Sequence, residues 1–219
     1  LEGMDKTLTV RSGIAALERI EMFFDTKIAL EGSDATWTLF KEYSFLCANG
    51  PVSGKGSLAL RCGSGPLIAG CFLFNAPVTL KGGLDVKAKV ALGSSGRLSV
   101  SGKTVFRRNS SLTVQLDGKT ARPHLELAGG LELHEFVSLF LEFLYMPQPG
   151  EKIILACSPA APVQGTFFNL PEGSVFSAEM HHDSPQGDSL AGTVNLRIHY
   201  TNTGIQATVV SVDRKNEAR

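Results

Sequence analysis

Apolar and polar residues alternate in short groups of three along the middle of the chain. Each group places an apolar residue on either side of one central residue, and Gly or Ser punctuates the chain between groups. Alternation over so few residues is typical of a short β-strand with one buried face. Six such triplets lie between residues 84 and 133: Leu84-Asp85-Val86, Val90-Ala91-Leu92, Leu98-Ser99-Val100, Leu112-Thr113-Val114, Leu125-Glu126-Leu127 and Leu131-Glu132-Leu133.

The spacing of these triplets predicts how the strands are connected. The triplets begin at positions 84, 90, 98, 112, 125 and 131, so two of the steps between them are about twice as long as the others. If Val105 marks a further strand in the first long gap, the step is about seven residues, which leaves no room for a helix between strands. Three sides per turn then give coils of about 20 residues. We therefore predict an all-β solenoid of parallel strands, in which each coil buries its inward residues by stacking on its neighbours.

The N-terminal part of the sequence is less regular and fits two structures. Residues 13–24 match an amphipathic helix capped by Ser12, which would cover the open end of the stack. The same region also fits two strands, Leu8-Thr9-Val10 and residues 21–24. The strand pattern returns from Ala35. We expect an N-terminal cap or irregular first coils over residues 1–49, solenoid coils over residues 50–133, and a C-terminal solenoid unit with its tail over residues 134–219.

Residues 137–145 form the one long apolar stretch. They predict a strand covered on both faces, with a buried helix as the alternative that periodicity does not reject. Pro147, Pro149 and Gly150 end the element. One face would carry Val137, Leu139, Leu141, Phe143 and Tyr145, and the other Phe136, Phe140 and Leu144.

Composition adds limits on partners. The 23 glycines indicate many tight corners, and charged residues, at 19%, fall below the usual quarter. Lys+Arg and Asp+Glu are equal at 21 each, so we expect no nucleic-acid partner. No apolar run approaches the roughly 18 residues that span a bilayer, so no membrane insertion is expected of this chain. Cys47, Cys62, Cys71 and Cys157 lack CxxC spacing and are interpreted as small buried residues, with one disulfide among the first three as the alternative.

Candidate catalytic and metal motifs are weak. Ser101-Gly102-Lys103-Thr104 resembles the end of a phosphate-binding loop, but Arg97 replaces its first Gly and no helix follows. The pair His181-His182 lies near Asp183 and Asp188, which we interpret as an exposed polar loop because adjacent residues of a strand point to opposite faces. We assign no catalytic, cofactor-binding or metal-binding residue and no cofactor. The remaining histidines are His124, His134 and His199.

Carboxylates near the predicted strands raise the question of carbohydrate chemistry. Parallel β-helices include polysaccharide lyases and glycosidases, whose carboxylates gather on one face. Glu126 and Glu132 alternate with leucines, as the outward residues of a coil would, and we interpret them as surface charge. The other candidates are Asp85, Asp117, Glu135 and Glu142.

The C-terminal third carries the most specific pattern. Residues 150–155, Gly-Glu-Lys-Ile-Ile-Leu, lead to residues 163–176, Val-Gln-Gly-Thr-Phe-Phe-Asn-Leu-Pro-Glu-Gly-Ser-Val-Phe, and then to Leu-Arg-Ile-His-Tyr-Thr at 196–201. These segments resemble the C-terminal passenger region of bacterial autotransporter-type β-helix proteins with autotransporter-associated β-strand repeats. The family patterns are GDxFxLL, GTFxNLPEGxVF and xxISYTGGDGNDVxLT. The resemblance covers roughly residues 50–212 and is most specific at residues 165–176.

This resemblance implies a right-handed parallel β-helix that is exported to the bacterial cell surface or beyond it. It also implies that the terminal segment nucleates folding outside the cell, so we expect residues 134–212 to anchor the stack. The family's Gly-Asp-rich turn is replaced by Asn202-Thr203-Gly204-Ile205-Gln206, without a carboxylate, so calcium binding there is not expected. Residues 165–176 are predicted to be a structural corner and not a binding loop, because their turn residues are flanked by anchoring apolar side chains.

The expected function is therefore a non-enzymatic structural or adhesive segment of an exported surface protein. Its partners would be neighbouring coils of the parent protein, and a surface glycan or protein would be the ligand if it is adhesive. The alternatives are a carbohydrate-active β-helix enzyme and a glycan or host-ligand binding module. A binding module would show exposed aromatic residues in a row, for which Trp37 and Tyr43 are the sequence candidates.

Overall fold

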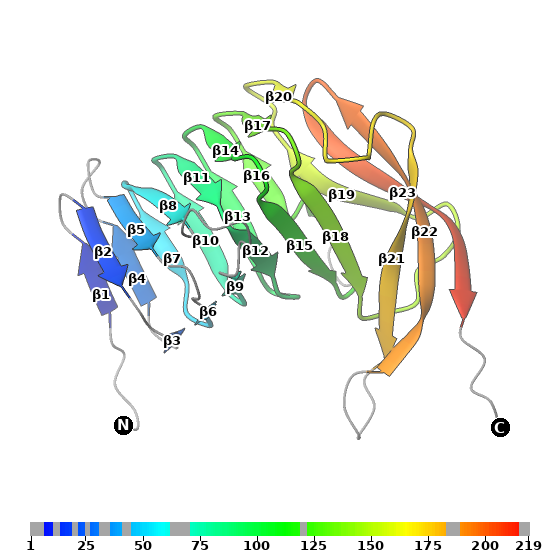
Figure 1. Cartoon of the computed structure of the whole chain (residues 1–219), viewed down its shortest axis with the longest axis horizontal. Coiled ribbons are helices and arrows are strands. Elements are labelled where there is room, and N and C mark those ends of the chain that lie inside the picture. Colours follow the sequence, from blue (N-terminus) through cyan, green and yellow to red (C-terminus); the bar gives the residue numbers. More distant parts are fainter. Residues whose placement is uncertain are drawn as a thin grey trace.

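The computed structural model of the chain is built of strands (Figure 1). It describes residues 7–10, 14–18, 22–24, 27–30, 36–40, 45–61, 71–118, 122–182 and 189–214. These residues form 23 strands, and no helix occurs among them. The all-β prediction is confirmed.

The predicted capping helix over residues 13–24 is wrong. Its described residues form strands β2 (Ile14–Glu18) and β3 (Met22–Phe24). Strand β2 pairs in parallel with β5 (Thr36–Phe40), where Ile14 lies beside Thr36. A periodic pattern of apolar residues within one segment does not show that the segment pairs with a strand from the next unit of the chain.

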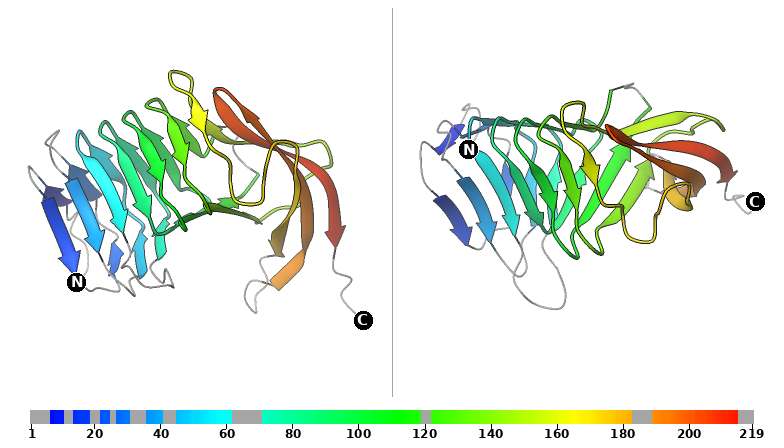
Figure 2. Two further views of the ribbon diagram at one scale, coloured as in Figure 1. Left: turned by 45° about the horizontal axis from the view of Figure 1, so that its top comes forward. Right: turned by 90° about the horizontal axis from the view of Figure 1, so that it is seen from above.

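Most strands belong to three parallel sets, because each strand pairs with the strand three places further along the chain. The first set is β1 (Thr7–Val10), β4 (Lys27–Leu30), β7 (Val52–Gly54), β10 (Pro77–Leu80), β13 (Arg97–Val100), β16 (Leu125–Leu127) and β19 (Lys152–Cys157). The second set forms a separate seven-stranded sheet of β2, β5, β8 (Ser57–Arg61), β11 (Leu84–Lys87), β14 (Thr104–Phe106), β17 (Leu131–Leu133) and β20 (Val163–Gln164). The third set is β3, β6 (Phe45–Ala48), β9 (Cys71–Phe74), β12 (Lys89–Leu92), β15 (Ser111–Leu116) and β18 (Ser138–Phe143). Figure 2 shows the three sets side by side along the molecule.

Residues 84–133 form parallel strands, as the triplets predict. Each of the six triplets lies within one strand, and Val105 lies in β14 as expected. Val78 pairs with Leu98, so the register step at this point agrees with the predicted coil length. The next step, from Leu98 to its partner Leu125, is longer, because the connections between strands lengthen in that part of the chain.

The core lies between the sheets and follows the triplets. The outer residues of each of the six triplets are buried, while the central residue is exposed or half-buried. In β14 all three residues, Thr104 to Phe106, are buried. A column of glycines, Gly56, Gly82, Gly102 and Gly129, lies where the first set of strands turns into the second. A Cβ on Gly102 would approach the backbone of Gly82 within 2.5 Å, so only Gly permits this stacking.

The apolar stretch at residues 137–145 forms strand β18 and its flanks, so the strand prediction is confirmed and the alternative helix is wrong. Its inward face is buried, with Phe143 at 0% exposure. The prediction of cover on both faces is wrong, since Phe140 points outward and is 55% exposed. Phe136 precedes the strand in a turn and is 40% exposed.

The C-terminal end of the stack changes to antiparallel pairing. Strands β21 (Val175–His182), β22 (Ser189–Thr201) and β23 (Gly204–Arg214) pair in succession, and β23 pairs with β19. Strand β21 also pairs with β18, so the three strands join the first and third parallel sets into one 16-stranded sheet. At the opposite end of the described chain, β1, β2 and β3 are the edge strands of the two sheets.

Candidate functional site

Polar residues lie in register on three strands of the seven-stranded sheet. Asp85, Glu132 and Gln164 share one row across the sheet, in which the buried Val105 separates Asp85 from Glu132. Arg107 donates two hydrogen bonds to the carboxylate of Asp85, at 2.9 and 3.0 Å. Both carboxylates of this row have an oppositely charged neighbour: Asp85 pairs with Arg107, and Glu132 with Lys103.

Glu132 lies at the centre of a small ion-pair network. Lys103 forms an ion pair with one carboxylate oxygen of Glu132, and Nε2 of His134 lies 2.9 Å from the other. The hydrogen bond from Lys103 is the main reason that the pKa of Glu132 is lowered, and His134 lowers it further. A glycosidase acid needs a raised pKa, so Glu132 is poorly suited to that role.

A shallow groove of about 460 Å³ runs beside this network. Polar side chains from three successive units meet there, because β14, β17 and β20 are neighbours in the sheet. The groove is lined by Arg108, Glu132, Leu133, His134, Glu135, Gln164 and Gly165.

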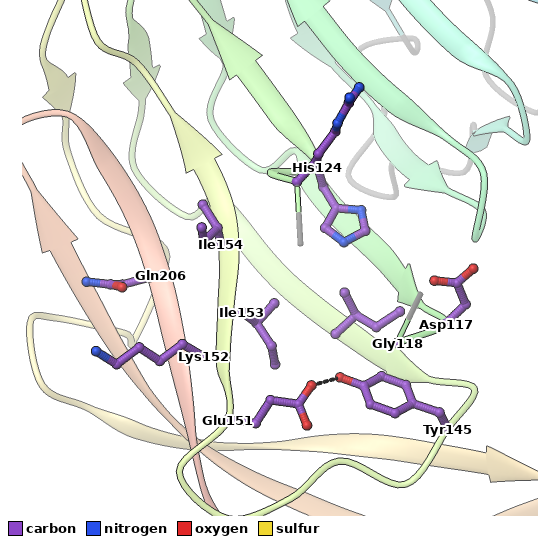
Figure 3. Close-up of a pocket in the computed structure, with 11 residues that line it drawn as sticks. Asp117, Gly118, His124, Tyr145, Glu151, Lys152, Ile153, Ile154 and Gln206 are labelled. Carbon is purple, nitrogen blue, oxygen red and sulfur yellow. Dashed lines mark hydrogen bonds between the residues drawn. The ribbon is translucent and has the colours of Figure 1, made fainter. Parts of the chain in front are cut away.

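A second, smaller cavity of about 220 Å³ lies where the connection after β15 meets the connection after β18 (Figure 3). Tyr145 donates a hydrogen bond to Glu151, and a second oxygen of Glu151 accepts one from the backbone N–H of Gln148 at 3.0 Å. Burial raises the pKa of Tyr145, and the neighbouring Glu151 raises it further. Tyr145 is therefore a neutral hydrogen-bond donor that orders the connection.

His124 forms the inner wall of this cavity and is only 4% exposed. Its Nδ1 lies 3.1 Å from Nη1 of Arg97, which also donates to the backbone carbonyl of Gly96 at 2.7 Å. Burial, with a smaller contribution from the Arg97 cation, lowers the pKa of His124 to about 4. A neutral imidazole that accepts from a guanidinium is a structural contact, and its protonation would place two positive charges together.

The corner at residues 165–176 is tied to strand β22 by Tyr200 and Glu172. The hydroxyl of Tyr200 accepts from the backbone N–H of Phe167 at 3.0 Å and donates to the carbonyl of Leu170 at 2.9 Å. Glu172 accepts from the backbone N–H of Tyr200 at 2.5 Å, and lies 2.9 Å from Nδ1 of His199. These contacts lower the pKa of Glu172, while burial raises the pKa of Tyr200 to about 12.

Anchoring of this corner to the core agrees with the sequence prediction. Phe167 and Leu170 are buried, at 3% and 8% exposure, and Phe176 packs against the core while partly buried. The sequence reasoning missed the bonds from Tyr200 and Glu172, although both residues lie in the quoted family motifs.

The other residues singled out from the sequence are not brought together. Cys157 is a free, half-buried thiol, whereas Cys62 and the side chains of Cys47 and Cys71 lie outside the described residues. His181 lies 3.3 Å from Glu179 on β21, but Asp183, Asp188 and the side chain of His182 are not described. The described residues contain no group of three or more His, Cys, Asp or Glu side chains placed to hold a metal ion.

Among the described residues, Glu132 and Glu135 both line the groove, but each lies beside a basic side chain, Lys103 and Arg108 respectively. Glu126 lies on the 16-stranded sheet, whereas Glu132 lies on the seven-stranded sheet, so they face different sides. Asp85 and Glu132 share one face but are separated by the intervening strand β14. Within the described part of the chain, no helix has the length and apolar character needed to cross a bilayer.

Phe136 and Phe140 are exposed where the sequence predicted burial, at 40% and 55%. Phe168, in the corner at residues 165–176, is 44% exposed. The sequence candidates for an aromatic row are not tested, since Tyr43 and the side chain of Trp37 lie outside the described residues.

No family model, no curated protein and no solved structure matches this chain. Function therefore has to be inferred from the described residues themselves.

Proposed function

We propose that this protein is a right-handed parallel β-helix that serves as a non-enzymatic structural segment of an exported bacterial surface protein. Its partners would be further coils of the parent protein, stacked on the N-terminal end. Its place would be the bacterial cell surface or the extracellular space, as the resemblance to autotransporter passenger regions implies.

The observation that carries this proposal is the difference between the two ends of the stack. At the C-terminal end, antiparallel strands β21–β23 join the first and third sets by pairing with β19 and β18, while β20 is the last strand of the seven-stranded sheet. At the other end of the described strands, β1, β2 and β3 each have a strand partner on one side only. The edge of a sheet is a template for further strands, so a stack whose first and third sets are joined at one end is suited to terminate a longer array.

The corner at residues 165–176 supports the same proposal. The part of the sequence that most resembles the autotransporter passenger region is the part held by Tyr200 and Glu172 against the core. Motif residues that fix a corner are what a terminal structural unit needs.

The charge arrangement favours a non-enzymatic role. Asp85 and Glu132 are each paired with basic side chains, and the pKa of Glu132 is lowered rather than raised. A general acid for glycoside cleavage requires the opposite environment.

Surface display in bacteria tests the proposal. The chain is placed between a secretion signal and an autotransporter translocator barrel, and intact cells are treated with trypsin. We expect a folded, surface-exposed segment for the natural sequence. Tyr200→Phe removes both hydrogen bonds of the hydroxyl and should reduce the displayed fraction, whereas Ser101→Ala, an exposed control, should not. Retention of the natural sequence inside the cell would contradict the proposal.

A further inference from the structure

Three corners stack at the junction between the second and third sets of strands. The corners at residues 107–110 and 134–137 correspond in register, since Phe106 lies beside Leu133 and Ser111 beside Ser138. The next corner contacts the second one, because the backbone N–H of Phe168 donates to the carbonyl of Val137 at 2.7 Å.

Each corner contains one residue in the left-handed backbone region. The φ values are +64° at Asn109, +59° at Phe136 and +57° at Asn169. Asn tolerates this conformation better than most residues, whereas a bulky side chain is strained there. The corner at residues 134–137 therefore carries Phe at the position where both neighbouring corners carry Asn.

Packing in the core does not explain the choice of Phe at this position. Phe136 is 40% exposed, so a large part of its surface faces solvent despite the strain. Strained backbone conformations of this kind cluster at functional sites, where a residue is kept for its function although it lowers stability.

The surroundings of Phe136 indicate what that reason is. The ring of Phe168 lies 5.1 Å away between centroids, tilted by 59°, and is 44% exposed. The guanidinium carbon of Arg108 lies 5.0 Å from the centre of the Phe136 ring. Arg108 also lines the polar groove described above, as does Glu135, the residue before Phe136 in the chain, so the aromatic pair borders the groove without lining it.

The charges around the groove balance. Lys103 pairs with Glu132, and Arg108 lies 4.0 Å from Glu135. Two cations and two carboxylates give no net attraction for a strongly charged ligand. The planar polar groups of Glu135, Gln164 and Arg108 nonetheless offer both donors and acceptors.

We propose that the groove and the Phe136–Phe168 pair bind a neutral oligosaccharide. A pyranose ring has an apolar C–H face that packs on an aromatic ring, and hydroxyl groups that both donate and accept hydrogen bonds. The groove volume of about 460 Å³ is within the usual range of small-molecule sites. This binding activity goes beyond the scaffold role and does not depend on it.

Phe136→Asn is the informative variant, because it installs the residue that both neighbouring corners carry. The full chain is applied to an array of immobilised neutral gluco-, galacto- and manno-configured oligosaccharides, with sialylated and sulfated glycans and unglycosylated peptides on the same array. We expect the natural chain to bind neutral glycans and Phe136→Asn to bind them at least tenfold more weakly, with an unchanged or higher melting temperature. Phe140→Ala removes an exposed Phe of strand β18 on the 16-stranded sheet, not a member of the Phe136–Phe168 pair, and should bind normally.

A second variant guards against a fold effect. Gln164→Ala removes an amide from the groove and should also weaken binding to neutral glycans if the groove holds the hydroxyl groups. The proposal is overturned if the natural chain binds no neutral glycan, if it prefers the acidic glycans or the peptides, or if Phe136→Asn binds as well as the natural chain. A marked fall in the melting temperature of Phe136→Asn would overturn it as well, since Phe136 would then be a structural residue.

Discussion

The parallel strands β7–β18 and the antiparallel strands β21–β23 bury the same kinds of residues but differ in how far apart their paired residues lie in the sequence. Parallel neighbours such as Leu98 and Leu125 are separated by a whole unit of the stack, and the parallel strands are short. Strands β22 and β23 are much longer, are joined by a tight turn, and pair from Thr201 and Gly204 outward.

This difference predicts which region forms first. A hairpin closes a short loop before its pairs begin to stabilise it, whereas each parallel pair requires the closure of a loop of roughly 20 residues or more. The antiparallel region can therefore form locally and then serve as the template on which β18 and β19 pair. The expectation that residues 134–212 anchor the stack remains a prediction, and the following experiments test it.

The largest effect is expected at the C-terminal corner. Leu170→Ala removes a buried side chain and should lower the free energy of unfolding by about 2–5 kcal/mol. Val210→Ala, at an exposed position of β23, should change it by less than about 0.5 kcal/mol. Urea unfolding measures both variants. Unchanged unfolding of Leu170→Ala would show that the corner is not anchored.

The next prediction concerns how the stability of the two regions depends on pH. His124 belongs to the parallel region, and its pKa is lowered from 6.5 to about 4 in the folded chain. The unfolded chain therefore binds more protons in this range, so stability should fall by about 3 kcal/mol as the pH drops from 6.5 to 4. Glu172, at the C-terminal corner, has a lowered pKa and should lose its contribution only below its ordinary value of 4.5.

Urea midpoints of the natural chain and His124→Asn between pH 7 and 4 test this expectation. The amide oxygen of Asn can take the place of Nδ1 as the acceptor for Arg97 and does not titrate, so the variant should lose most of the decline above pH 4.5. An identical pH dependence in both proteins would assign the decline to other groups.

A smaller effect is expected in the glycine column. Gly102→Ala places a methyl group 2.5 Å from the backbone of Gly82, which cannot move without disturbing its own strand. We expect a loss of about 1–3 kcal/mol, as for other overpacked sites. Ser101→Ala, at an exposed position of the same corner, is the matched control. Equal melting temperatures for the two variants would show that the column is not tightly packed.

Hydrogen exchange compares the two regions directly, and the expected difference in their opening free energies is the smallest of these effects. Amides of residues 196–200 should be at least tenfold more protected than those of residues 84–116, which corresponds to about 1.4 kcal/mol of opening free energy. Longer protection of residues 84–116 would place the anchor in the parallel region.

The sequence was sufficient to predict the parallel strands, because the triplets state both the buried face and the step between strands. Val105 could be placed as a strand from that step alone. Residues 14–24 could not be assigned in the same way, because short apolar periods fit helix and strand alike. Their strand structure depends on pairing with β5 and β6, which no local pattern reveals.

The candidate sites were harder to predict for the same reason. Arg97 and His124 come from successive units of the stack, so their contact becomes visible only when the length of that unit is known. Phe136 was assigned to one face of a strand covered on both sides. Its exposure depends on where the turn before β18 begins, and an apolar run gives no signal of that boundary. Phe168 lies in the corner after β20, and its contact with Phe136 joins two successive units.

The glycine column has a consequence for how proteins of this architecture change in length. Gly82, Gly102 and Gly129 each lie against the backbone of the glycine one unit earlier, so the position of each is defined relative to the neighbouring unit and not to either terminus. Duplication or deletion of one whole unit would restore every glycine to an equivalent contact. A short insertion inside a strand would shift all later contacts in that unit. Recombination between units can thus lengthen or shorten the molecule while its cross-section is preserved.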